Sequence, residues 1–155
     1  MKKEVKTKIL KKIALSSLLV LLIGSKYVAN TCWANCKDSS WNYNVGGNAD
    51  DVRYTFSRTK ENTSKAYCYI KSFSNKESSD GLIVDLVDGN SGKKFSKSWP
   101  RTLYSAGQYS ITNYAYEDRG SACSVKLKFS STNYRWTYTW SAAGLWSPDS
   151  SKNYS

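Results

Sequence analysis

The chain has 155 residues, of which 40% are hydrophobic and 14% aromatic, and it carries 23 Lys and Arg against 12 Asp and Glu, with no His. This length suits one domain with one core. The absence of His excludes the ordinary Ser-His and Cys-His nucleophilic sites and removes a common zinc ligand. We therefore expect no metal and no cofactor.

Residues 1–34 have the three parts of a secretory signal peptide, namely a basic start, an apolar run at 13–23 and a polar stretch that ends in small residues. The apolar run is shorter than the about 20 residues that cross a bilayer. Cleavage fits best after Ala34, and cleavage after Ala29 is the alternative. We expect a secreted protein, either extracellular or associated with the cell wall.

The expected mature segment, 35–155, is modestly basic. It holds sixteen of the Lys and Arg residues and eleven of the Asp and Glu residues, which gives a net charge of +5. A charge of this size favours solubility and attraction to anionic surfaces. We predict that 35–155 is one secreted domain.

The cysteine count depends on the cleavage site. The later cleavage leaves three cysteines, whereas the earlier one leaves four and allows a short Cys32–Cys36 loop. Cys68 and Cys123 both lie in strand-like runs that are far apart in the sequence. We therefore expect a disulfide between these two, which would stabilise the fold by about 2–4 kcal/mol.

Apolar and polar residues alternate with a period of two along most of the mature segment. This alternation predicts strands at 41–45, 52–57, 66–73, 108–116, 122–130 and 134–141, and a short continuous apolar run broken only by Asp85 predicts another at 82–87. Turn-rich segments separate the strands. About seven short strands with regular turns indicate an all-β fold, and we predict a single antiparallel β-sandwich, with a small barrel as the alternative.

The last two of these strands are expected to form a hairpin. The predicted cross-strand pairs place apolar residues on one face: Phe129 with Tyr134, Leu127 with Trp136, Val125 with Tyr138, and Cys123 with Trp140. A slip of one residue would separate these partners onto opposite faces. The other face then carries the bases Lys126, Lys128 and Arg135.

Aromatic residues outnumber aliphatic ones in the mature segment, with twenty Trp, Tyr and Phe against thirteen Ile, Leu and Val. Large rings suit the core of a small domain. Thirteen aliphatic residues do not need so many aromatic companions, however, and exposed aromatic patches mark binding sites. The rings predicted to form an exposed aromatic surface, for a glycan or another flat partner, are Trp99, Tyr104, Tyr109, Tyr114 and Tyr116.

The segment 93–101, KKFSKSWPR, interleaves basic and aromatic residues. A solvated loop is the simpler interpretation, and the functional one is contact with an anionic cell-wall polymer, a membrane surface or a glycan. The bases predicted to bind such a surface are Lys93, Lys94, Lys97, Arg101, Lys126, Lys128 and Arg135. We expect no nucleic-acid partner, because the sequence contains no nucleic-acid recognition module.

Signs of catalysis are weak. Asp85 and the neighbours Glu117 and Asp118 offer carboxylates for glycoside hydrolysis, but the simpler interpretation of Asp85 is an outward strand residue. The segment 88–92 imitates the start of a calcium loop, yet the twelfth position of that loop would be Trp99 instead of Glu. We predict a plain turn at 88–92 and no enzymatic activity.

The C-terminal part combines a V-x-L strand, an Asn-containing turn, an aromatic strand and a closing G-x-W with acidic neighbours. The residues of this pattern are Val125, Leu127, Asn133, Tyr138, Gly144, Trp146 and Asp149. The pattern resembles an uncharacterised family of small secreted strand-rich proteins of Gram-positive bacteria. That resemblance implies no established activity and no catalytic residue. A weaker likeness, in style alone, is to bacteriocins of the lactococcin 972 type.

Together these observations predict a secreted, non-enzymatic binding or cell-surface protein, without indicating its ligand or its oligomeric state. An exported, bacteriocin-like antimicrobial polypeptide is the alternative function. An extracellular hydrolase is the third.

Overall fold

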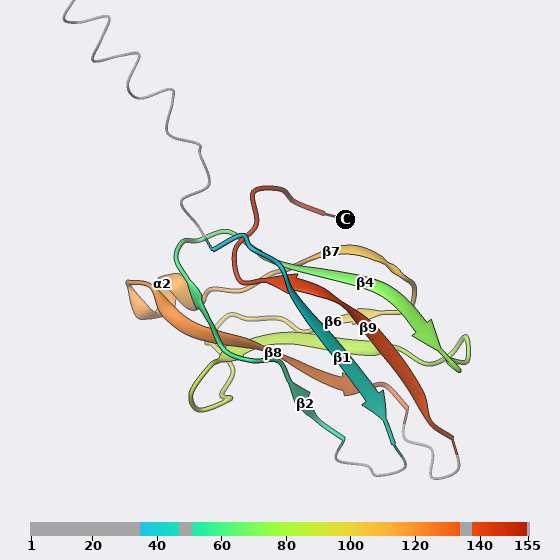
Figure 1. Ribbon diagram of the computed structural model, residues 1–155. Helices are drawn as coiled ribbons and strands as arrows, with labels where there is room; N and C mark the ends of the chain where they lie inside the picture. The colour runs from blue at the N-terminus through green and yellow to red at the C-terminus, as the bar shows by residue number, and fades with distance from the viewer. Residues whose placement is uncertain (1–34, 47–50, 134–137, 155) are drawn as a thin grey trace, which may run out of the picture. The chain divides into compact units, whose positions relative to one another are not determined.

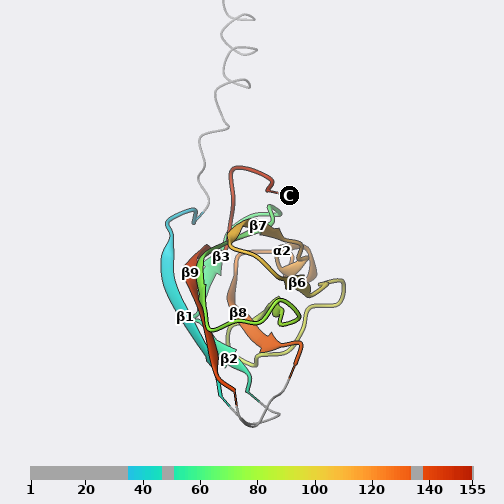
Figure 2. The same ribbon diagram turned by 90° about the vertical axis from the view of Figure 1, so that its right-hand side faces the viewer.

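The computed structural model describes residues 35–46, 51–133 and 138–154. Two antiparallel sheets pack face to face, which confirms the predicted all-β sandwich (Figures 1 and 2). The compact unit that contains them runs from Ala34 to Ser155 and has its own hydrophobic core.

The strands divide between the sheets as follows. Sheet A contains, in spatial order, β1 (Ser39–Val45), β9 (Trp140–Ser147), β4 (Ala66–Ser74) and β7 (Gly107–Ile111). Sheet B contains β2 (Arg53–Tyr54), β8 (Cys123–Ser131), β5 (Leu82–Asp88) and β6 (Arg101–Leu103), and β3 (Arg58–Lys60) also pairs with β8. The short helix α2 (Ala115–Arg119) precedes β8.

Aromatic rings join the two sheets in the core. Buried residues alternate with more accessible ones along β1, β8 and β9, as period-two side-chain geometry requires. The rings of Trp41 on β1 and Phe129 on β8 lie 4.5 Å apart between centroids. Tyr43 lies 5.9 Å from Phe129 and 6.1 Å from Trp140 by the same measure. Part of the aromatic excess therefore fills the core.

The predicted hairpin between 122–130 and 134–141 is wrong. β8 pairs with β2, β3 and β5 in sheet B, whereas β9 begins at Trp140 and pairs with β1 and β4 in sheet A. Residues 134–137 lie outside the described residues. The run that follows Trp140 is rich in Ser, Ala and Gly and has low strand propensity, but its small side chains leave space for the rings of neighbouring strands.

Two further predicted strands differ from the structure. The expected strand 52–57 is interrupted, because β2 has two residues and β3 begins only at Arg58. The expected strand 108–116 ends at Ile111, where the chain turns into α2. The side chain of Asn113 accepts a hydrogen bond from the Ala115 N–H, and Gly120, at φ 67°, supplies the left-handed residue that ends the helix.

The predicted Cys68–Cys123 disulfide is also wrong, since both thiols are free. Cys68 points into the core from β4 of sheet A, and burial raises the pKa of its thiol to about 12. Cys123 begins β8 in sheet B, and its thiol donates to the carbonyl of Ala115 at 3.5 Å. Cys36 is disulfide-bonded. Cys32, the partner expected when cleavage follows Ala29, lies outside the described residues.

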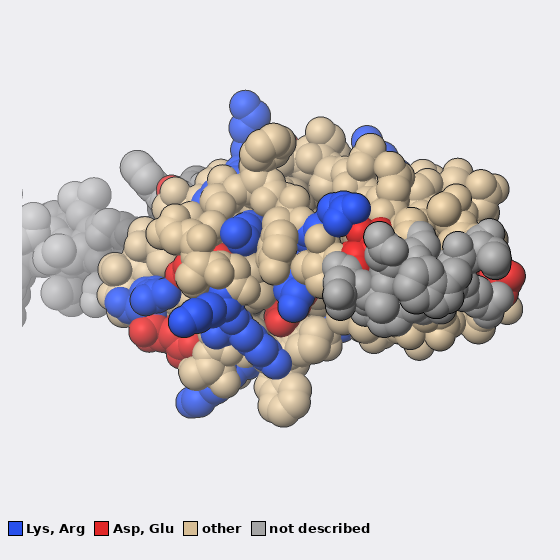
Figure 3. All heavy atoms as spheres, turned by 90° about the horizontal axis from the view of Figure 1, so that it is seen from below, with Lys and Arg blue, Asp and Glu red and all other residues tan. Residues whose placement is uncertain are grey.

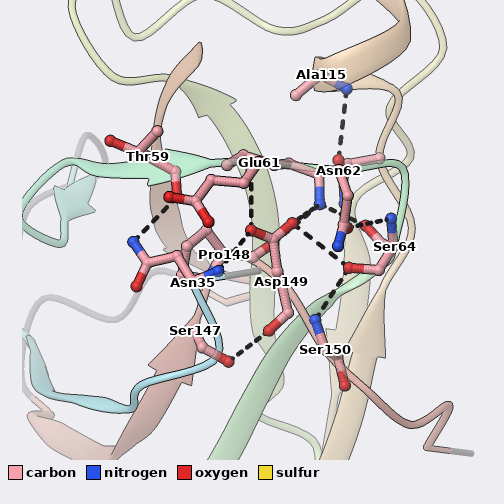
Figure 4. Close-up of polar contacts among 12 residues, drawn as sticks. Asn35, Thr59, Glu61, Asn62, Ser64, Ala115, Ser147, Pro148, Asp149 and Ser150 are labelled. Atoms are coloured by element: carbon pink, nitrogen blue, oxygen red, sulfur yellow. Dashed lines mark hydrogen bonds and ion pairs between the residues drawn. The ribbon is translucent and has the colours of Figure 1, made fainter. Parts of the chain in front are cut away.

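Lys60 and Asp149 form a fully buried ion pair, and Figure 4 shows Asp149 with the polar groups around it. Lys60 Nζ, at the end of β3, is 2.9 Å from Oδ1 of Asp149, and both side chains are completely shielded from solvent. The same ammonium donates to the carbonyls of Ser64 and Pro148. Burial lowers the pKa of Lys60, while its hydrogen bond to Asp149 opposes this shift. Three acceptors thus satisfy the three N–H groups of the ammonium.

The carboxylate of Asp149 is equally well satisfied. Its Oδ2 accepts from the backbone N–H groups of Asn35 and Glu61, at 3.3 and 2.9 Å, and its Oδ1 also accepts from the Ser64 hydroxyl at 3.4 Å (Figure 4). The network therefore fastens the start of the described domain, the β3–β4 connection and the segment after β9 to one another.

Replacing Lys60 with Met is expected to lower the free energy of unfolding by about 3–5 kcal/mol, because it leaves the Asp149 carboxylate buried without its counter-ion. The double variant Lys60→Met/Asp149→Leu should regain part of this loss. Urea denaturation measures both, and Lys65→Met, at an exposed lysine in the same connection, serves as the control with a change below about 0.5 kcal/mol. A loss as small as that of the control would contradict this role.

Gly144 is expected to tolerate no side chain. A Cβ there would lie 1.8 Å from the carbonyl oxygen of Tyr69 and 2.8 Å from Cζ2 of Trp41, so β9 approaches its neighbours as only Gly allows. Gly144→Ala should cost about 3 kcal/mol or more through overpacking, measured by urea denaturation. Ala143→Ser, on the opposite face of β9, should change stability little, and equal effects of the two variants would refute the close packing.

Candidate functional site

The outer face of sheet B carries a row of lysines. In the β5–β8 register, Val87 lies opposite Lys126 and Asp85 opposite Lys128. An isolated bridge places Lys94 on the other side of Val87. Directly opposed residues project from the same face of a sheet. Lysines from β8 and from the segment after β5 therefore meet on one face.

Aromatic rings lie beneath these ammonium groups. Lys126 Nζ is 4.7 Å from the ring centroid of Tyr54, and Lys94 Nζ is 5.5 Å from that of Trp99. At exposed sites such a cation–π contact contributes about 0.5–1 kcal/mol. Each contact holds a flexible lysine against a flat apolar surface, so that charge and ring are presented together.

The remainder of the basic segment continues this arrangement toward α2. Lys97 Nζ lies 6.0 Å from the ring centroid of Tyr114, just before the helix. The segment is held there by Asp118, whose carboxylate accepts from the backbone N–H and the hydroxyl of Ser96, both at 2.7 Å. These hydrogen bonds lower the pKa of Asp118.

Arg101 has a structural role, because its side chain contacts the other sheet. Its guanidinium donates to the carbonyl of Ser110 at 3.2 Å and lies 5.1 Å from the ring centroid of Tyr109. Ser110 and Tyr109 belong to β7 of sheet A, whereas Arg101 belongs to β6 of sheet B. The residue thus closes the sandwich along its β6–β7 side.

We call this arrangement of lysines and rings the cation–aromatic belt. Its residues are Tyr54, Lys93, Lys94, Lys97, Trp99, Tyr114, Lys126 and Lys128. The three rings are 47%, 71% and 37% exposed for Tyr54, Trp99 and Tyr114, so they are available to a partner. Figure 3 shows Lys and Arg side chains clustered on the lower face of the domain, with acidic side chains interspersed.

The five aromatic residues that the sequence predicted to be exposed differ in their exposure. Trp99 and Tyr114 are exposed in the belt, and Tyr104 is 55% exposed elsewhere. Tyr109 is partly buried against the core and bonds through its hydroxyl to Ser105, and Tyr116 is only half-buried. Three of the five candidate rings are therefore exposed, and the other two are half-buried.

The seven basic residues predicted to bind an anionic surface also differ in position. Lys93, Lys94 and Lys97 are exposed, and Lys126 and Lys128 occupy the outer face of β8, as alternation predicts. Arg101 turns toward sheet A instead. Arg135 lies outside the described residues. The predicted cationic and aromatic surfaces thus coincide along the segment 93–99 and its neighbours.

Sequence reasoning missed one residue of this surface and the burial of a second residue beside it. The sequence predicts a strand at Tyr54, but the contact of Tyr54 with Lys126 depends on β2 pairing with β8, which no local pattern reveals. Asp85 does lie on the outward face of β5, yet only 8% of it is exposed, and its Oδ1 has no hydrogen-bond partner. Burial raises the pKa of Asp85, while the charges of Lys94 and Lys128 lower it.

The turn at 88–92 is held by Asp88. Its Oδ1 accepts from the backbone N–H groups of Asn90 and Ser91 and from the Ser91 hydroxyl, and Arg119 lies 2.6 Å from its Oδ2. The bonds from Ser91 are the largest of the causes that lower its pKa to about 2. The plain turn is confirmed, and no group of three His, Cys, Asp or Glu residues in the described ranges could hold a metal.

Comparison with known proteins identifies a family without a known function. A family model described as "Protein of unknown function (DUF2712)" matches residues 27–150. No curated protein and no solved structure matches the chain. Among the described residues, no helix is long and apolar enough to cross a membrane.

Asp85→Asn is expected to stabilise the protein at neutral pH. The pKa of Asp85 is raised in the folded state. The protonated side chain therefore stabilises the folded wild type below the unfolded pKa of about 3.9, and this stabilisation is lost as pH rises through the folded pKa. The variant's advantage in thermal melts should therefore grow between about pH 3 and 7. An advantage that does not change with pH would contradict the raised pKa.

Proposed function

The chain belongs to the DUF2712 family of proteins of unknown function, and we propose that it is a secreted, non-enzymatic protein that binds an anionic polymer of the cell surface. The observation that carries this proposal is the pairing of lysines with exposed rings in the cation–aromatic belt. The signal-like residues 1–34 support secretion.

The belt suits a polymer that offers both negative charge and flat apolar faces. Ammonium groups attract phosphate or carboxylate groups, and the exposed rings of Trp99 and Tyr54 provide surfaces on which sugar rings can lie. A cell-wall glycan that carries acidic groups has both features. The belt residues come from β2, from β8, from the segment after β5 and from the start of α2, so the contact would extend over several elements as an extended polymer requires.

Two acidic residues, Asp85 and Asp118, lie beside the belt. Asp85 lies beneath it between Lys94 and Lys128, and Asp118 is engaged by Ser96. Lys93, Lys94 and Lys97 are exposed, and Lys126 and Lys128 are half-buried, so five lysines face these two carboxylates. Binding would therefore be chiefly electrostatic, with the rings adding contact area that salt does not screen.

Changing Lys93, Lys94, Lys97 and Lys126 to Ser is expected to release the protein from purified anionic cell walls. Wild-type binding should also weaken between 0.1 and 1 M salt, where the screening length falls from about 10 to 3 Å. The melting temperature should change little, since exposed charges contribute little to stability. Arg101 is left intact because it joins the two sheets. Co-sedimentation with the walls measures the binding.

A matched control removes the same charge elsewhere. Its four exposed lysines are Lys37, Lys65, Lys71 and Lys152. This control should keep most of its binding, and Trp99→Ala should weaken binding in a way that persists at high salt. Equal loss in both quadruple variants would show that only net charge matters and would refute the belt. Growth inhibition of related bacteria by the purified protein would instead support the antimicrobial alternative.

A further inference from the structure

One side of the sandwich is open. β1 ends the strand order of sheet A and β2 ends that of sheet B, and the two strands lie beside each other (Figure 1). Within the described residues, β1 pairs with β9 alone. On the opposite side, Arg101 bonds across from β6 to Ser110 of β7. The two sides of the sandwich therefore differ in the contacts of their edge strands.

An uncharged groove of about 510 Å³, with both polar and aromatic lining residues, lies along the open side. It is lined by residues 40–42, residues 54–56 and Phe129. The rings of Trp41 and Phe129 border it from the core, and the side chain of Phe56 is 94% exposed beside it. None of these lining residues carries a charge, so the groove suits an uncharged, partly apolar occupant.

Strand β1 lacks the usual protection of an edge strand. Its seven residues, SSWNYNV, include no Lys, Arg, Asp, Glu or Pro. Edge strands are normally protected against pairing by charges, prolines or bulges. An unprotected edge beside an uncharged groove favours the addition of another strand, which would pair with the backbone and cover the groove.

The sequence of β1 is compatible with a copy of itself. An antiparallel pair centred on Asn42 would place Asn42 opposite Asn42 and Ser40 opposite Asn44 on the outer face, so that no like charges meet. On the inner face, Trp41 would lie opposite Tyr43 of the other copy. We propose that β1 is the interface of a two-fold symmetric dimer, in which each copy covers the other's groove and the exposed Phe56.

This interface borders the cation–aromatic belt only at Tyr54 and does not rest on the proposed polymer binding. The test uses the segment 30–155, which contains the compact unit and keeps Cys32. Sedimentation velocity over a concentration series should show a dimer. A non-reducing gel identifies any disulfide-linked species, which is excluded from the count.

Asn42→Lys should raise the dissociation constant at least about tenfold, because two lysines would meet at the symmetry axis. An equimolar mixture of Asn42→Lys and Asn42→Asp should restore the dimer. Ser72→Lys, which adds the same charge at an exposed position of β4, should leave the dimer unchanged. Asn42 is exposed, so the melting temperature should be preserved, and Phe56→Ser is the second variant expected to weaken the dimer.

Two results would overturn the proposal. A protein that remains monomeric up to about 1 mM would exclude a useful self-association and leave the groove to a different ligand. A dimer that Asn42→Lys and Phe56→Ser both leave intact would use another face. Restoration by the mixed charges would establish that the two copies meet at Asn42.

Discussion

The buried pair of Lys60 and Asp149 is the interaction on which the rest of the domain depends. Lys60 ends a strand of sheet B, and Asp149 follows the last strand of sheet A, so their contact joins the two sheets at one end. Burying two charges is costly, and an apolar pair could be as stable. The hydrogen bonds to Ser64, Pro148 and the nearby backbone instead give the pair one geometry, which fixes where three distant chain segments meet.

The core and this network leave the outer face of sheet B free for other uses. Alternation turns Val125, Leu127 and Phe129 inward and leaves the lysines of β8 on the outside. Rings from β2 and from the segment after β5 then lie against the lysines. A rigid sheet thus presents charge and aromatic surface together, which is the arrangement that the proposed attachment to an anionic polymer requires.

The two sides of the sandwich illustrate a general constraint on two-sheet folds. Each sheet ends in strands whose outer backbone groups have no neighbour, and each must be closed, protected or paired. Arg101 closes the β6–β7 side with a bond from one sheet to the other. The β1–β2 side carries a groove and an uncharged strand instead, and this difference gives the two sides different capacities for contact.

The sequence by itself determined the sandwich class and the positions of β1, β4, β5 and β8, because alternation with a period of two, or for β5 a short continuous apolar run, is a local property of each strand. It also identified the basic and aromatic residues of the segment 93–99 as a candidate surface. Tertiary structure decided which strands pair, that Cys68 and Cys123 stay apart, that Tyr54 joins the surface, and that Asp85 is buried beside it. The reason is physical: strand partners and the burial of polar groups depend on space and hydrogen bonds supplied by residues far away in the chain, as Gly144 shows by letting β9 pass close to β4.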